Sequence, residues 1–357
     1  MNAKALAVAA AMGAAPAAVN AAELELYGTI GAAGEFLDND TRQSGEVSNN
    51  HSVIGIKGSR ELLPGVRGVF LADWFVGIDR GADPDSGGLF GEGRDGWVGL
   101  EGDAWGTVAL GFQGRPWKTA THHLDPFEGT IADYSAIMGT ISQVNDPGQI
   151  YFDGGIGNSI IWFGPNINGL SWHAQYGVDR DDPNDWGIQV NYTQGPLYLV
   201  ASFDRFRAQR RDEVPDDVDA IKVAGSYNFG QGTTIIAMVE NLRNEDIHTR
   251  DAAVYLGATH RINTTTFQAA VAWADDVDEV SSSGATYLAL GVSHNPRQDV
   301  ELYALVSYID NDSNGAYQFI SAPHTSRNRN TEIAAAGDDS WAVGLGIKYH
   351  FSANLLP

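Results

Sequence analysis

Three groups of residues in this 357-residue chain have side chains and spacings that could bind a cofactor or a metal ion. Gly91 to Gly96 spell G-x-G-x-x-G, which in dinucleotide-binding proteins follows a strand and opens a helix. His122, His123 and Asp125 offer nitrogen and oxygen ligands for a metal ion. Three acidic clusters could hold Ca²⁺ or Mg²⁺ through their oxygen atoms. The clusters are Asp181-Asp182-Asp185, Asp212-Glu213-Asp216-Asp217-Asp219 and Asp275-Asp276-Asp278-Glu279.

Each set also has a plainer interpretation. A strand-like segment, Trp97 to Leu100, follows the glycine motif where a helix is required, so we expect loop and strand entry there. Adjacent histidines rarely converge on one ion, so we expect solvated loop residues and no metal site. None of the acidic clusters has the spacing of an EF-hand, and charge runs usually serve solubility, although divalent binding stays open.

Enzymatic motifs are also missing. The chain has no cysteine, which excludes a thiolate nucleophile, a thiolate metal site and a disulfide scaffold. It has no G-x-S-x-G motif for a nucleophilic serine. A pair of catalytic carboxylates can be neither identified nor excluded among so many acidic residues. We therefore predict a protein that is not an enzyme and that needs no cofactor.

The charge balance is strongly acidic, with 22 Lys and Arg against 45 Asp and Glu and a net charge of −23. Such a chain is unsuited to nucleic acid, because a phosphate-binding surface needs Lys and Arg. The acidic excess is compatible with cation traffic, with a divalent-rich surface or with a salty habitat.

The first residues have the pattern of a secretory signal. Lys4 precedes the small-apolar run Ala5 to Ala18, which is too short to span a bilayer as a helix, and Val19-Asn20-Ala21 fits a cleavage site. We predict a signal peptide over residues 1–21 and an exported mature chain. No apolar stretch of about 18 residues follows, so a membrane location requires a closed barrel.

The rest of the chain has the residue pattern of β-strands, which would position its polar side chains. Segments of about ten residues alternate apolar with small or polar side chains, as strands with one apolar face do. In the last segment, Trp341, Val343, Leu345, Ile347, Tyr349 and Phe351 share one parity. Aromatic residues near strand ends are typical of membrane-interface girdles. They include Trp97, Trp105, Trp162, Tyr349 and Phe351.

We can draw roughly sixteen such strands, a size within the range of bacterial barrels. Short connections, such as those over residues 62–65, 195–196 and 263–264, alternate with long polar ones, such as those over residues 38–51 and 115–148. This asymmetry is typical of outer-membrane barrels. The prediction is an all-β, transmembrane antiparallel β-barrel over residues 22–351, followed by a short C-terminal tail, residues 352–357.

Four segments carry a family resemblance. Ala22–Gly28 is similar to the first strand of general Gram-negative bacterial porins. Leu124–Gly139 (LDPFEGTIADYSAIMG) resembles the inward-folded third loop of that family, and Asn158-Ser159-Ile160 stands where its next strand begins. Lys348-Tyr349-His350-Phe351 resembles its last strand, which ends on an aromatic residue. The resemblance covers essentially all of the mature chain.

The resemblance implies a homotrimer in the outer membrane, in contact with lipid and lipopolysaccharide, with one water-filled pore per monomer for ions and small hydrophilic solutes. It also implies a constriction where acidic residues on the third loop face basic residues on the wall. The acidic candidates are Asp125, Glu128 and Asp133 on the loop. The basic candidates are Lys57, Arg67 and Arg94 on the wall and Lys118 at the start of the loop, and Phe351 is the candidate assembly signal. With acids in excess, we expect cation preference.

Two other functions stay open. A substrate-specific channel, for example for sugars, would need aromatic side chains along the lumen, for which Phe75, Tyr198 and Tyr303 have the right parity. A secreted soluble β-protein would show the same alternation of apolar and polar residues but would bury its apolar face in a dry core.

Overall fold

The computed structural model describes most of the chain after the predicted signal peptide, which lies outside the described residues. The described ranges are 22–40, 43–79, 90–141, 150–152, 154–178, 185–206, 218–244, 250–319 and 335–356. All statements below on what is present or absent concern these ranges.

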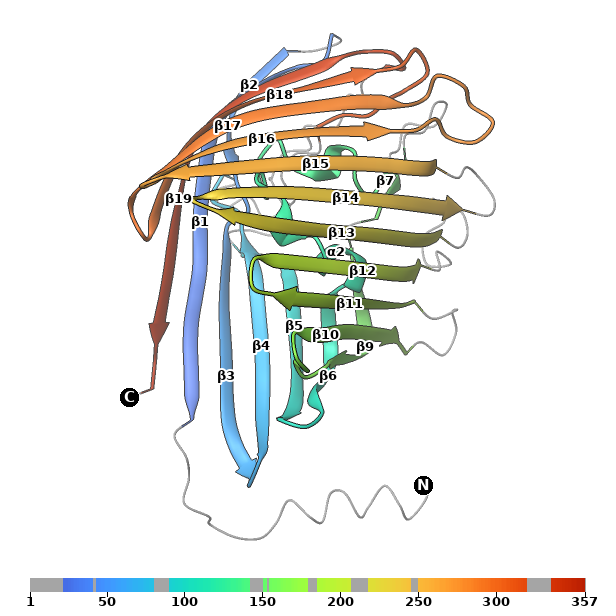
Figure 1. Cartoon of the computed structure of the whole chain (residues 1–357). Coiled ribbons are helices and arrows are strands. Elements are labelled where there is room, and N and C mark those ends of the chain that lie inside the picture. The colour runs from blue at the N-terminus through green and yellow to red at the C-terminus, as the bar shows by residue number, and fades with distance from the viewer. Residues whose placement is uncertain are drawn as a thin grey trace.

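Long antiparallel strands form nearly all of the described structure, and they close into a single barrel (Figure 1). Neighbours along the chain pair in order, and the last strand pairs with the first to close the ring. The wall strands are β1 (Glu23–Asp38), β2 (Gln43–Asn49), β3 (Val53–Leu63), β4 (Val66–Val76), β5 (Phe90–Gly102), β6 (Gly106–Gly114), β9 (Gly155–Phe163), β10 (Leu170–Gly177), β11 (Trp186–Gln194), β12 (Leu197–Phe206), β13 (Val218–Gly230), β14 (Thr233–Asn244), β15 (Arg250–Ile262), β16 (Thr265–Ala274), β17 (Ala285–Arg297), β18 (Val300–Asn311) and β19 (Ser340–Asn354).

The number of strands agrees with the prediction. The described sheet has 17 strands, but β2 and β3 both pair with β1, one after the other, so they fill one place in a 16-stranded wall. β2 lies inside the segment that the sequence predicts as a loop over residues 38–51. The glycine motif Gly91–Gly96 lies within β5, in agreement with the prediction of strand entry.

The connections divide between two rims. Short turns gather at one rim, hereafter the short-turn rim, and longer connections leave the other, hereafter the long-loop rim (Figure 1). Gly65 in the turn between β3 and β4 has a φ of +76°, which costs a glycine no steric strain. The predicted turns at residues 195–196 and 263–264 also join consecutive strands, β11 to β12 and β15 to β16.

The outer surface of the wall is apolar. On β19, the side chains of Trp341, Val343 and Leu345 are 38–63% exposed, whereas Ala342 between them is fully buried. A soluble domain buries such residues, while a membrane barrel turns them to lipid. Trp162 is exposed on this surface, as the predicted girdle requires.

Trp97 corrects the predicted girdle. Its side chain lies on the inner face of β5, since it is opposite in parity to the exposed Val98 and Leu100, and its indole N–H donates to Gln113 Oε1 at 2.8 Å. The alternation with Val98 and Leu100 was therefore a better guide to the face of Trp97 than its position near the strand end.

Helices are few and short: α2 (Pro116–Thr119), η2 (His122–Leu124) and η3 (Tyr134–Ala136). Within the described ranges, none has the length and apolar character of a membrane-crossing helix. All three lie in the connection between β6 and β9, which we call loop 3, together with the small hairpin of β7 (Thr140–Ile141) and β8 (Ile150–Tyr151).

The C-terminal strand is longer than predicted. β19 continues to Asn354 and pairs with β1 through Tyr27↔Ser352 and Glu25↔Asn354. The first three residues of the predicted tail, 352–354, are therefore part of the wall, and Phe351 lies within the strand.

Candidate functional site

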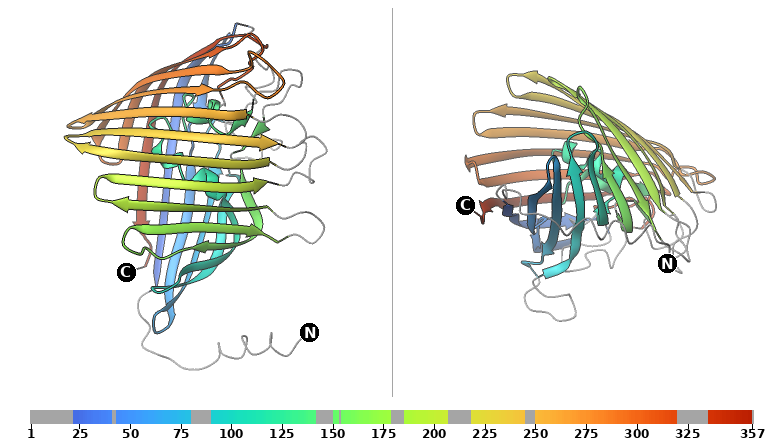
Figure 2. Two further views of the ribbon diagram at one scale, coloured as in Figure 1. Left: turned by 45° about the vertical axis from the view of Figure 1, so that its right-hand side comes forward. Right: turned by 90° about the horizontal axis from the view of Figure 1, so that it is seen from below.

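Loop 3 lies inside the barrel and is fastened to one side of its wall (Figure 2). Its residues Phe127, Ile131, Ala132 and Ile137 are almost completely buried. Its polar contacts to strands β12 to β17 include Trp117 N to Asp204 (2.8 Å), Tyr198 to Ala120 O (3.1 Å), Tyr255 to Asp125 (2.7 Å), Gln268 to Pro126 O (2.7 Å) and Tyr287 to Ala132 O.

A buried charge cluster holds the middle of loop 3, at Ile137 and Gly139. Glu240 on β14 pairs with Arg250 on β15 and lies 3.6 Å from Lys222 on β13, and all three side chains are fully buried. Glu240 also accepts the backbone N–H of Gly139, and Arg250 donates to the carbonyl of Ile137 at 2.7 Å. The two bases and one acid therefore join three strands to loop 3.

Two of the predicted acidic residues serve the loop itself. Asp125 accepts hydrogen bonds from the backbone of Phe127 (3.0 Å) and Tyr134 (2.8 Å). Asp133 accepts from the backbone of Gly129 (2.8 Å) and the hydroxyl of Ser135 (2.5 Å). Burial, and then the charge of Asp133, raise the pKa of Asp125 well above its usual range. Both carboxylates are buried and brace the fold of the loop.

Glu128 is the predicted acid that stays accessible, with about a third of its side chain exposed. It pairs with His122 at 3.0 Å. Burial, followed by the nearby charge of Asp133, raises the pKa of Glu128 to about 7. The positive charges of Lys348, Arg94 and Lys118 act on it in the opposite direction.

Of the four predicted bases, Arg94 on the wall and Lys118 in α2 of loop 3 act on Glu128, whereas Lys57 and Arg67 pair with other acids. Arg94 pairs with Asp73 on β4 at 3.3 Å, and both Arg94 and Lys118 influence Glu128. Lys57 instead pairs with Glu25 at 3.1 Å.

Arg67 follows the turn between β3 and β4 and pairs with Glu101. Lys57 and Arg67 thus lie toward the short-turn rim, where each already has an acidic partner.

Sequence reasoning missed two residues of the site. Lys348 on β19 donates from Nζ to the backbone carbonyl of Glu128 at 3.0 Å, and its parity among the polar residues of the last strand could have identified it. His51, in the connection between β2 and β3, packs on His122 with ring centroids 5.9 Å apart. Nothing in the sequence showed that this connection would turn toward loop 3.

The three aromatic residues considered for a sugar path contact loop segments. Phe75 packs edge-on against His51 at 5.5 Å, and Tyr198 packs against His123 at 5.1 Å. Tyr303 receives a hydrogen bond from Asn50. Each of the three therefore contacts a different residue, His51, His123 or Asn50.

The acidic clusters give no cation site in the described ranges. Asp276 uses its carboxylate to accept the backbone N–H groups of Ser282, Ser283 and Gly284, at 2.7–3.0 Å, which lowers the pKa of Asp276. The clusters at residues 181–182 and 212–217 lie outside the described ranges. Asp185 is described, and it lies 3.7 Å from Arg115.

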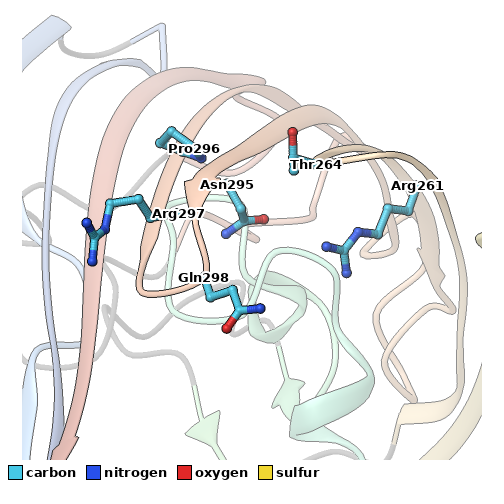
Figure 3. A pocket seen from close by; sticks show the side chains of 6 residues that line it. All are labelled: Arg261, Thr264, Asn295, Pro296, Arg297 and Gln298. Atoms are coloured by element: carbon cyan, nitrogen blue, oxygen red, sulfur yellow. The ribbon is translucent and has the colours of Figure 1, made fainter.

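A shallow pocket at the short-turn rim contains two arginines (Figure 3). Arg297 pairs with Asp299 at 3.0 Å, and Arg261 donates to the carbonyl of Asn263 at 2.9 Å. Figure 3 shows that the Arg297 guanidinium points away from that of Arg261, so the two do not converge on a shared anion.

A closed barrel with an apolar outer surface and a loop fixed inside defines a transmembrane β-barrel of the channel-forming class. The comparisons with known proteins agree. The family model described as Gram-negative porin matches residues 5–314, so the chain belongs to that family and is a protein of the outer membrane.

Individual relatives are distant. An outer membrane porin protein of Bordetella pertussis is 24% identical over 199 residues, which are 50% of this chain and 49% of that protein. The chain thus matches about half the length of this curated relative. The solved anion-selective porin from Comamonas acidovorans has a TM-score of 0.77 at 18% identity, covering 93% of this chain and 100% of that one. OmpT of Vibrio cholerae has a TM-score of 0.64 at 16% identity, covering 93% and 98%.

Proposed function

We propose that this protein is a passive diffusion channel for ions and small hydrophilic solutes. The observation that carries the proposal is loop 3, which is fastened to strands β12–β17 inside a closed barrel and faces Arg94 and Asp73 on the wall. A loop in that position narrows a lumen to molecular size. Purified protein in planar bilayers should give stepwise ionic conductance, and vesicles that contain it should swell with small sugars. Folded protein that gives neither conductance nor swelling would refute the proposal.

We further propose weak cation preference. The net charge of −23 favours cations at both mouths, and Glu128 adds a negative group at the constriction. Three bases, Arg94, Lys118 and Lys348, act on that same group and oppose the preference. Asp125 and Asp133 are buried and hydrogen-bonded within loop 3. The cation preference should therefore be weaker than it would be if all three acids faced the lumen. One structural neighbour is described as anion-selective, so the sign is the point to measure.

Glu128→Gln should lower the cation-to-anion permeability ratio by about twofold to fivefold. A unit charge about 4 Å from a permeating ion contributes roughly 1 kcal/mol in water-like surroundings, which is about a factor of five. The measurement is the reversal potential in a KCl gradient, made with a chelator present and at a pH well above 7, where the Glu128 carboxyl is ionised because its pKa is about 7. The matched control is Glu279→Gln, which removes the same charge from an exposed position in the connection between β16 and β17. Equal effects of both substitutions would show that Glu128 has no local role.

Assembly as a homotrimer in contact with lipid and lipopolysaccharide is part of the same proposal. Membership of the porin family and the apolar belt on the outer surface support it, because that belt must meet lipid or a second barrel. Chemical cross-linking in native outer membranes should give a heat-sensitive trimer. A monomer as the largest species would refute this part.

A further inference from the structure

Three potential metal ligands meet in the constriction. His51 comes from the connection between β2 and β3, while His122 and Glu128 come from loop 3. One ligand atom of each lies within 4.8 Å of the others. Among the described residues, this is the one group of three histidine and carboxylate side chains that come so close together. The sequence alone predicted no metal site, because His51 is far from the other two in the chain.

The group has an unused ligand atom. His122 Nε2 and Glu128 Oε1 are 3.0 Å apart, which is a normal pairing distance. The Nδ1 atom of His51 is shielded from solvent and makes no hydrogen bond with any described residue. Buried polar nitrogens nearly always have a partner, so this one calls for an explanation. A bound cation between the three side chains would supply it.

The surroundings hold His51 in place. The residue has a φ of +55°, which is uncommon for any residue except glycine. Gly129 of loop 3 packs directly on it, since a Cβ at Gly129 would lie 2.6 Å from the Cβ of His51. The ring also packs on Phe75. The backbone conformation of His51 and the glycine at position 129 therefore both allow loop 3 to pack closely on this residue.

The donor set indicates the kind of metal. Two imidazoles and one carboxylate are typical ligands of zinc, with a fourth position left for water. Hard cations such as Ca²⁺ and Mg²⁺ prefer six or more oxygen ligands, which this group does not offer. Arg94, Lys118 and Lys348 repel any dication, which disfavours ions held mainly by charge and leaves those that form strong bonds to nitrogen.

We propose that His51, His122 and Glu128 form a binding site for late first-row transition-metal dications, and that a bound ion modulates the channel. Tetrahedral ligands about 2.0–2.1 Å from zinc lie roughly 3.4 Å from one another, so small side-chain rotations close the present arrangement. A bound dication would place two positive charges at the constriction. Cation current should fall and anion preference should rise.

The test uses Zn²⁺ and the detergent-solubilised full chain. Isothermal titration calorimetry should show one zinc site per monomer, and His51→Ala and His122→Ala should each weaken it by roughly tenfold or more. His123→Ala is the matched control, because His123 is on the same loop but packs on Tyr198 outside the group. Its zinc affinity should equal that of the unchanged protein. Equal affinity in all of the variants would overturn the proposal.

A second readout separates this site from the proposed function. In bilayers, micromolar Zn²⁺ should reduce the current through the unchanged channel, EDTA should restore it, and His122→Ala should abolish the effect. Zinc binding without any conductance would refute the channel and leave the site standing. Conductance without calorimetric zinc binding would refute the site and leave the channel standing. Heat-sensitive migration of each variant in gels confirms that it is folded.

Discussion

Glu240→Gln is expected to lower the free energy of unfolding by about 3–5 kcal/mol and to loosen loop 3. The substitution keeps the shape of the side chain but removes the one negative charge between Lys222 and Arg250, which are both fully buried. Two uncompensated buried charges would then lie against the loop. Arg250 and Glu240 also hold the backbone at Ile137 and Gly139, so the loop should lose its fixed position.

The measurements are unfolding in guanidinium and the size limit for sugars in vesicle swelling. The variant should unfold at lower denaturant and admit larger sugars, while Glu279→Gln should change neither. A triple variant, Lys222→Met, Glu240→Leu and Arg250→Met, separates the two effects. It removes all three charges and should recover much of the stability, because apolar groups can replace a buried ion pair, but it should still admit larger sugars. An unchanged size limit in both variants would show that the charge cluster does not hold the constriction.

Val190→Arg should be the most damaging substitution on the outer surface of β11, with a loss of about 2–4 kcal/mol. Val190 is in the middle of the strand and 41% exposed on the apolar face. An arginine there must place its guanidinium in hydrocarbon or distort the bilayer to reach water. The expected result is a lower midpoint of unfolding in lipid vesicles.

The control is the next residue, which points the other way. Asn191 is half-buried on the inner face and donates to Ser171 Oγ at 2.7 Å. Asn191→Arg loses that hydrogen bond but keeps its charge in water, so the cost should stay within about 1 kcal/mol. Similar costs for both substitutions would mean that the outer surface does not face lipid.

The wall of the barrel was predictable because alternate side chains of a strand point to opposite faces, so the sequence shows which residues lie on each face. Trp341, Val343 and Leu345 show this, since their parity predicted the exposed face that the structure has. The strand β2 was not predictable. Its residues are Gln, Ser, Gly, Glu, Val, Ser and Asn, which have the composition of a loop, and its pairing with β1 decides its structure.

The site was predictable only in part. Residue type and resemblance selected Arg94, Lys118 and Glu128, which the structure brings together. The same reasoning could not tell that Asp125 and Asp133 turn inward to brace the loop, because an acidic side chain that caps backbone N–H groups looks the same in sequence as one that faces water. The role of His51 could not be predicted, because a contact between segments that are distant in the chain leaves no local pattern in the sequence.

The seam between β1 and β19 has a consequence for biogenesis. It runs from Glu25↔Asn354 to Asp38↔Trp341 and joins strands from opposite ends of the chain. Until the ribosome has finished and the last strand has arrived, every partly folded form keeps two open edges that can pair with other chains. Insertion therefore cannot proceed strand by strand to a stable product during synthesis. Closure of the barrel must therefore wait for β19, and the two strand edges stay available to other copies of the chain until then.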